Sequence, residues 1–168
     1  MLVQLSANIL IIPKTNFNQV KLMKLNWSRI ILGAIAYLVI GLIMNTVSSL
    51  LTMDYYKNPN YFAVWSKVMM PGQGAPPATF YYYSVAFLFI VGLIYSFIYG
   101  KVKGLLKGTT ILKGLRYGFA LFLMAGIPFF FSLYLLINLP LSLLIYWLVI
   151  DGLLTYLLGG IAIAWLNK

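Results

Sequence analysis

Few side chains in this sequence could do chemistry, and their types restrict what that chemistry is. The 168 residues include neither His nor Cys, so disulfides, thiolate nucleophiles and the usual zinc, haem and iron–sulfur ligand sets are excluded. Two carboxylates are present, Asp54 and Asp151, and they stand far apart in the sequence. We therefore expect no catalysis by a familiar residue set, no metal site and no cofactor; a bound lipid is the one exception left open.

The composition indicates that lipid surrounds much of the chain. Apolar residues make up 62% of the sequence and charged residues 8%, whereas ordinary soluble domains have about 45–50% and about 25%. A soluble protein with so few charges could not cover its surface with polar groups. The formal charge of +10 then belongs at helix ends beside anionic headgroups, and nucleic acid is not an expected partner.

Four apolar stretches are each long enough to cross a bilayer as an α-helix. They cover residues of about 30–51, 80–99, 115–136 and 141–166. They predict an all-α domain over 27–168, an integral membrane antiparallel four-helix bundle, preceded by a basic cytoplasmic tail over 1–26. The string from Met23 to Trp27 looks like a natural chain start, so the residues before it are either a tail or the product of a misplaced start codon.

The positions of Lys and Arg in the short flanks predict the orientation. Basic residues precede the first span and fill the link between the second and third spans, whereas the link near Asn138 has none. We therefore expect both ends of the chain on the cytoplasmic side of a bacterial-type inner membrane. The basic link also supplies the predicted contacts to anionic lipid, which are Lys101, Lys103, Lys107, Lys113 and Arg116.

This orientation can be tested with reporter fusions. A reporter that is active only in the cytoplasm should give signal when it is fused at Lys107 or at Lys168. The same reporter fused at Gln73, in the link between the first two spans, should give none. Signal at Gln73 with none at Lys107 would reverse the orientation.

The first link, residues 52–79, is the one sizeable piece outside the predicted spans. Asn58–Pro59 is typical of a helix start, because Asn caps the helix and Pro fits its first position. The apolar residues that follow recur at helical spacing. We therefore predict a short amphipathic helix over 59–70 on the outer membrane surface, with Trp65 as its interfacial anchor.

Asp151 is the most informative residue, because an ionisable group deep in a span is costly and commonly functional. It lies about 15 residues, or about 22 Å of helix, from the end of the fourth span. We expect it to face the bundle interior near Asn45 and Ser84. Pro128 frees the carbonyl of Met124, which a protonated Asp151 could bond. The predicted polar layer is thus Asp151, Asn45, Ser84 and Pro128.

Small residues lie along one face of each predicted span. In membranes such faces let two helix backbones approach closely. Four helices need these faces for packing within one bundle, which we favour over a dimer interface. The predicted packing glycines are Gly41, Gly92, Gly118, Gly152 and Gly159.

Three pieces of the sequence together resemble a broad group of uncharacterised four-span bacterial inner-membrane proteins. They are Asn45 in the first span, the stretch from Gly92 to Lys103, and the stretch from Trp147 to Trp165 with Asp151 inside it. The resemblance covers most of residues 27–168 and implies the four-span architecture. It implies no activity, since that group brings none.

Three functions are compatible with these features. The leading hypothesis is a non-enzymatic accessory or structural subunit of a membrane complex, or a homo-oligomer, that acts through contacts with helices and lipids. The alternative is a small transporter or ligand-binding protein that uses the polar layer around Asp151. The third is a membrane enzyme acting on lipid or quinone. A cavity that reaches Asp151 would favour the alternative, and a dry, packed Asp151 would favour the leading hypothesis.

Overall fold

A computed structural model of the chain describes residues 25–72 and 75–168, so nearly all of the predicted tail lies outside the described residues. The described part is helical and has no strand. Four of its helical stretches are long and apolar enough to cross a membrane. The predicted all-α four-helix architecture is therefore confirmed.

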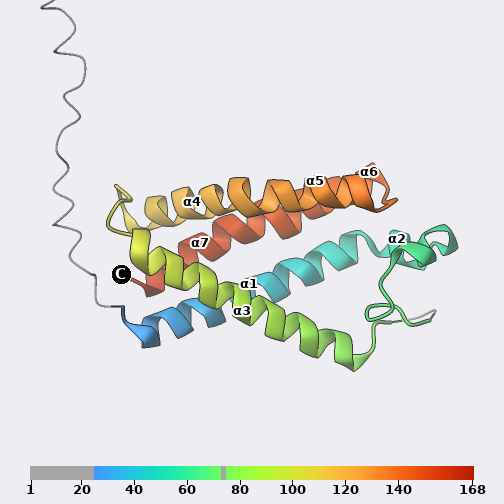
Figure 1. Cartoon of the computed structure of the whole chain (residues 1–168), viewed down its shortest axis with the longest axis horizontal. Coiled ribbons are helices and arrows are strands. Elements are labelled where there is room, and N and C mark those ends of the chain that lie inside the picture. The colour runs from blue at the N-terminus through green and yellow to red at the C-terminus, as the bar shows by residue number, and fades with distance from the viewer. Residues whose placement is uncertain (1–24, 73–74) are drawn as a thin grey trace, which may run out of the picture.

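The first two spans are continuous α-helices, and the last two each contain a π-helical segment (Figure 1). The first span is α1 (Trp27–Leu51) and the second is α3 (Ala78–Val102). The third span consists of α4 (Thr110–Leu121), the π-helical segment η3 (Phe122–Gly126) and α5 (Ile127–Leu136). The fourth consists of α6 (Leu141–Trp147), the π-helical segment η4 (Leu148–Leu154) and α7 (Thr155–Leu166).

Capping side chains start two of the spans earlier than predicted. The Asn26 side chain accepts a hydrogen bond from the Arg29 amide at 3.2 Å, so α1 begins at residue 27 rather than 30. The Thr109 side chain likewise accepts from the Leu112 amide at 3.4 Å. The third span therefore begins at residue 110 rather than 115, and Lys113 lies within the helix.

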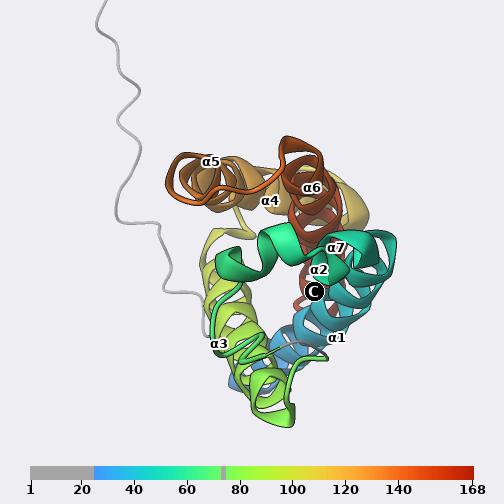
Figure 2. The same cartoon turned by 90° about the vertical axis from the view of Figure 1, so that its right-hand side faces the viewer.

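The helices pack as two antiparallel pairs joined through the middle. α4 packs along α7, α3 packs along α1, and α1 also packs along α7 (Figures 1 and 2). We call the end that carries residues 52–77 the loop end, and the end that carries the link 103–109 the basic end. At the loop end α3 and α5 diverge, which leaves room between the two pairs (Figure 1).

Glycines allow the helices in each pair to approach closely. A Cβ atom on Gly92 would lie 2.8 Å from the carbonyl oxygen of Ala34 on α1. A Cβ atom on Gly118 would overlap the backbone of Tyr156 on α7. The other three predicted packing glycines face side chains: Gly41 faces Leu88, Gly152 faces Phe130 and Gly159 faces Tyr37.

The core of the bundle is built largely from tyrosines, which sequence reasoning did not single out. Tyr37, Tyr99 and Tyr117 are buried. The ring of Tyr37 packs on that of Tyr95, which also packs on that of Tyr156, and the rings of Tyr99 and Tyr117 pack on each other. The Tyr117 hydroxyl donates to the Tyr95 carbonyl at 2.6 Å, and the Tyr95 and Tyr156 hydroxyls lie 3.3 Å apart. Because a buried hydroxyl needs such a partner, these bonds link α3, α4 and α7 specifically.

A polar cluster closes the basic end. Buried Asn167, just after α7, donates through its side-chain amide to the Ser96 hydroxyl at 3.1 Å and to the Ile163 carbonyl at 3.0 Å. The Lys103 ammonium donates to the Asn167 carbonyl at 2.7 Å, and the Arg29 guanidinium donates to the Lys168 carbonyl. These hydrogen bonds therefore connect the end of the fourth span to α1 and α3.

The loop end differs from the predicted amphipathic helix over 59–70. The structure has a 3₁₀ helix, η2 (Pro59–Val64), after which Trp65 adopts an extended conformation. A separate helix that was not predicted, α2 (Met53–Lys57), precedes it, and both lie across the loop end (Figure 2). The Tyr55 hydroxyl on α2 lies 2.6 Å from the Ser142 hydroxyl on α6, which ties this segment to the fourth span.

The side chain of Trp65 packs on protein. Its ring centroid lies 4.8 Å from that of Tyr56 and 6.0 Å from that of Trp147, and 9% of the residue's surface is exposed. The indole N–H is buried and has no hydrogen-bond partner among the described residues. Trp65 therefore connects the loop directly to the fourth span.

Candidate functional site

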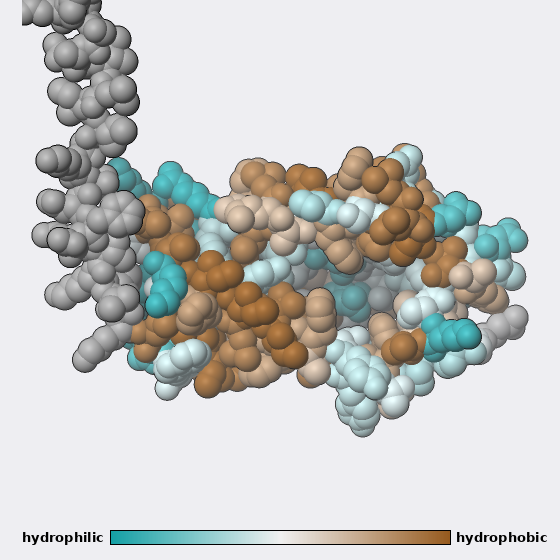
Figure 3. Space-filling view, in the orientation of Figure 1, coloured by the Kyte–Doolittle hydropathy of each residue, from teal (hydrophilic) through white to brown (hydrophobic). Residues whose placement is uncertain are grey.

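A cavity of about 820 Å³ occupies the loop end of the bundle. It lies where the two helix pairs diverge, and the hollow is visible in the surface between α5 and the loop-end half of α3 (Figure 3). The segment of α2 and η2 contributes to its rim. Residues from all four spans and from the first link therefore meet around one space.

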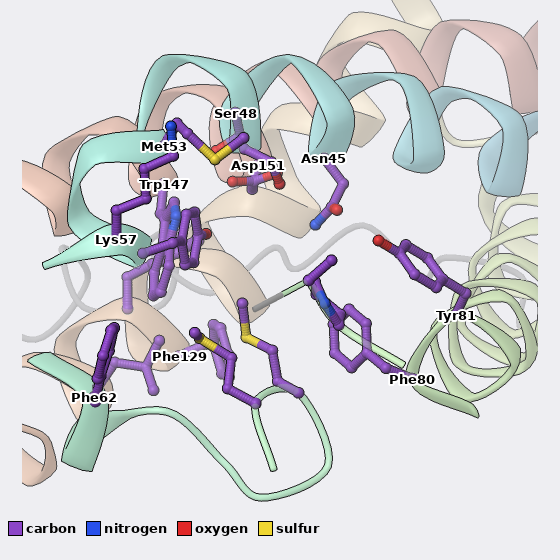
Figure 4. A pocket seen from close by; sticks show the side chains of 18 residues that line it. Asn45, Ser48, Met53, Lys57, Phe62, Phe80, Tyr81, Phe129, Trp147 and Asp151 are labelled. Carbon is purple, nitrogen blue, oxygen red and sulfur yellow. The ribbon is translucent and has the colours of Figure 1, made fainter. Parts of the chain in front are cut away.

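The polar floor of the cavity comes from α1 and η4. Asn45, Ser48 and Ser49 lie three and four residues apart on α1, so they share one face of that helix. Asp151 comes from η4 and lies beside Ser48 (Figure 4). The Ser48 hydroxyl is buried and has no hydrogen-bond partner among the described residues. The floor therefore combines hydroxyl, amide and carboxyl groups from two spans.

The third and fourth spans both depart from regular α-helix, and they do so at the same depth in the bundle. Pro128 lacks an N–H group, and the preceding Ile127 amide donates to the Phe122 carbonyl, five residues back, which closes η3. In the fourth span the hydroxyl of Thr155, the first residue of α7, donates to the Ile150 carbonyl in η4 at 3.1 Å, also five residues back. The two π-helical segments contact each other. Such segments occur frequently at functional sites, and Asp151 lies in one of them.

The walls of the cavity are aromatic and thioether side chains. Large apolar surfaces with a few polar groups at one end are typical of sites for small organic ligands. The aromatic lining residues are Tyr56, Phe62, Phe80, Tyr81, Phe129, Phe130 and Trp147, and the methionines are Met53, Met69 and Met70.

The rim at α2 adds a half-buried phenol and a single cation. Burial raises the pKa of Tyr56, and hydrogen bonding with Thr52 and Trp147 partly offsets that effect. The Lys57 side chain also lines the cavity. The phenol therefore remains a neutral hydrogen-bonding group, and the cavity carries one basic group in addition to the carboxyl group of Asp151.

The structure brings two of the four residues of the predicted polar layer to the cavity and places the other two elsewhere. Asn45 and Asp151 both line the cavity, whereas Ser84 and Pro128 do not. The Ser84 hydroxyl donates to the Phe80 carbonyl at 2.9 Å on its own helix. Pro128 is exposed on the bundle surface, and no hydrogen bond joins Asp151 to the Met124 carbonyl in the described part of the chain.

Sequence reasoning missed several residues that the fold brings to this cavity. Ser48 and Ser49 carry a detectable signal, because they lie three and four residues after Asn45 and so share its helix face. Tyr56 and Lys57 carry none, because their place depends on how the first link folds back over the bundle. The described residues contain no group of three or more acidic, His or Cys side chains that could hold a metal ion.

Comparisons with protein-family models, with curated proteins and with solved structures give no match for this chain.

Proposed function

We propose that the protein is a small membrane protein that binds an amphipathic ligand in the loop-end cavity. The observation that carries this proposal is the cavity of about 820 Å³ that reaches Asp151 from one side. Ligand sites commonly have about 300–1,000 Å³, mostly apolar walls and a few placed polar groups. The cavity has these properties, and an open Asp151 favours ligand binding or transport over a purely structural role.

The same proposal includes an orientation in the membrane. The basic end would lie on the cytoplasmic side of a bacterial-type inner membrane, because Lys and Arg collect there. Burial lowers the pKa of Lys103, and the positive charges of Arg29 and Lys113 lower it further. Converging positive charges of this kind favour an anionic lipid headgroup as neighbour. The loop-end cavity would then open on the outer side.

An accessory-subunit role is a second candidate, supported by one surface. The loop-end half of α3 presents an aromatic face on which Tyr83 is 67% exposed and Phe87, four residues later, is 65% exposed. A helix of a partner subunit or of a second copy could cover this face. Lipid acyl chains would cover it equally well, so we rank this role below ligand binding.

Ligand binding can be tested with a neutral brominated alcohol, 11-bromoundecanol, whose bromine quenches tryptophan fluorescence on contact. The protein is placed in phosphatidylcholine nanodiscs with Trp27→Phe and Trp165→Phe, because these two residues are exposed on the bundle surface. Two tryptophans remain, Trp147, which lines the cavity, and Trp65, whose ring packs on that of Trp147, and together they report on this end of the bundle. We expect a saturable quenching phase in addition to the linear phase caused by alcohol dissolved in the lipid.

The matched variants place one extra ring inside or outside the cavity. Ser49→Phe narrows the cavity and should weaken the saturable phase by about tenfold or more. Thr46→Phe adds the same ring at an exposed position of α1 outside the cavity and should leave that phase unchanged. Quenching that stays linear in the parent protein and in both variants would overturn the proposed function.

A further inference from the structure

We propose that the ligand is an amphipathic organic cation whose charged group pairs with the Asp151 carboxylate, an inference that rests on the proposed function.

The first argument is the charge balance around Asp151. The chain has one other carboxylate, Asp54, which is exposed on α2 and does not line the cavity. The hydrogen bonds that basic side chains donate in the described residues go to backbone carbonyls at the basic end. Within residues 25–72 and 75–168, therefore, no basic side chain is bonded to Asp151. Because a carboxylate in a span requires a partner, the cavity is complementary to a positively charged group.

The second argument is the chemistry of the walls. The face of an aromatic ring attracts cations through its quadrupole and disfavours anions. Trp147 and Tyr56, which line the cavity next to Asp151, are strong and moderate examples of such rings. Methionine side chains add a polarisable surface that adapts to ligands of different shape. The Asp151 carboxylate and the aromatic rings therefore both favour a positively charged ligand.

The third argument is the position of Lys57. It contributes to the lining from α2 in the first link, whereas Asp151 contributes from η4 in the fourth span (Figure 4). A compact inorganic cation would make no favourable contact with the large apolar walls. An organic cation with an extended apolar body can place its charge at the floor and its body against the rings. A zwitterion that also contacts Lys57 is the competing ligand class, and the experiment below distinguishes it.

The test uses two ions of nearly the same size and shape but opposite charge, tetraphenylphosphonium and tetraphenylborate. Each is titrated against bound 11-bromoundecanol in the nanodisc assay. We expect tetraphenylphosphonium to displace the alcohol saturably and tetraphenylborate not to displace it at the same concentration. Asp151→Asn should lower the affinity for tetraphenylphosphonium by about tenfold or more. Asp54→Asn removes the other acidic side chain and should leave the affinity for tetraphenylphosphonium unchanged.

Further outcomes separate the two proposals. If both ions displace the alcohol equally, in the parent and in Asp151→Asn, the cation proposal fails while ligand binding stands. If the alcohol itself shows no saturable binding, the proposed function fails. Lys57→Gln should strengthen phosphonium binding by removing a like charge. If dodecylphosphocholine binds more tightly than the phosphonium and loses affinity in both Asp151→Asn and Lys57→Gln, the ligand is a zwitterion and the cation proposal is overturned.

Discussion

Gly118→Ala is expected to destabilise the bundle by about 1–3 kcal/mol, the usual effect of forcing extra atoms into a packed interior. A Cβ atom at this position would lie 2.9 Å from the carbonyl carbon of Tyr156 and 3.0 Å from the Cα atom of Leu157. These are backbone atoms of the neighbouring span, so no side-chain rotation can make room. α4 and α7 would have to separate along the most extensive helix contact in the structure.

The loss is measured as a fall in the midpoint of thermal unfolding in detergent. Gly41→Ala is the matched control, because its Cβ atom would meet only the end of the Leu88 side chain, at 3.0 Å. We expect that control to change stability by less than about 1 kcal/mol, since a flexible side chain can move. Equal effects of the two variants would show that α4 and α7 do not pack at this distance.

The sequence was sufficient to predict the spans, because apolar length alone identifies a membrane-crossing helix. It was less informative about where each span begins. Thr109 caps α4 through one hydrogen bond, and that local bond extends the third span by five residues beyond its apolar stretch, from the predicted 115 to 110. The charges of Lys113 and Arg116 concealed this extension, because they lower the hydropathy of the first turns while remaining good helix formers.

The candidate site shows a different limit. Depth along a span follows from the sequence, and Asn45 and Asp151 do reach one cavity. The rotation of each helix about its axis does not follow from depth, so Ser84 was assigned to the layer although its hydroxyl donates to the Phe80 carbonyl on its own helix. The π-helical segments shift that rotation further in the last two spans. Residues of the first link joined the site through folding that no local pattern specifies.

Trp65→Ala should release the first link from the bundle. Trp65 is nearly fully buried between Tyr56 and Trp147, and truncating a buried Trp to Ala typically costs about 3–5 kcal/mol. The loss should be local, because η2 makes its main contact with α2, where the rings of Tyr55 and Tyr61 pack together. We expect faster hydrogen exchange throughout residues 53–70 and little change in exchange within α4 and α7.

Trp65→Phe tests whether ring packing or the indole N–H fastens the link. The N–H is buried and has no partner in the part of the chain that the structure describes, and such an unpaired donor costs about 1–3 kcal/mol. Phe removes that cost and retains most of the ring contact, so Trp65→Phe should protect residues 53–70 almost as well as the parent. Val68→Ala, at a half-exposed position of the same link, is the control for truncation in general. If Trp65→Ala exchanges like the parent, Trp65 contacts lipid rather than Trp147, as the sequence-based prediction of an interfacial anchor proposed.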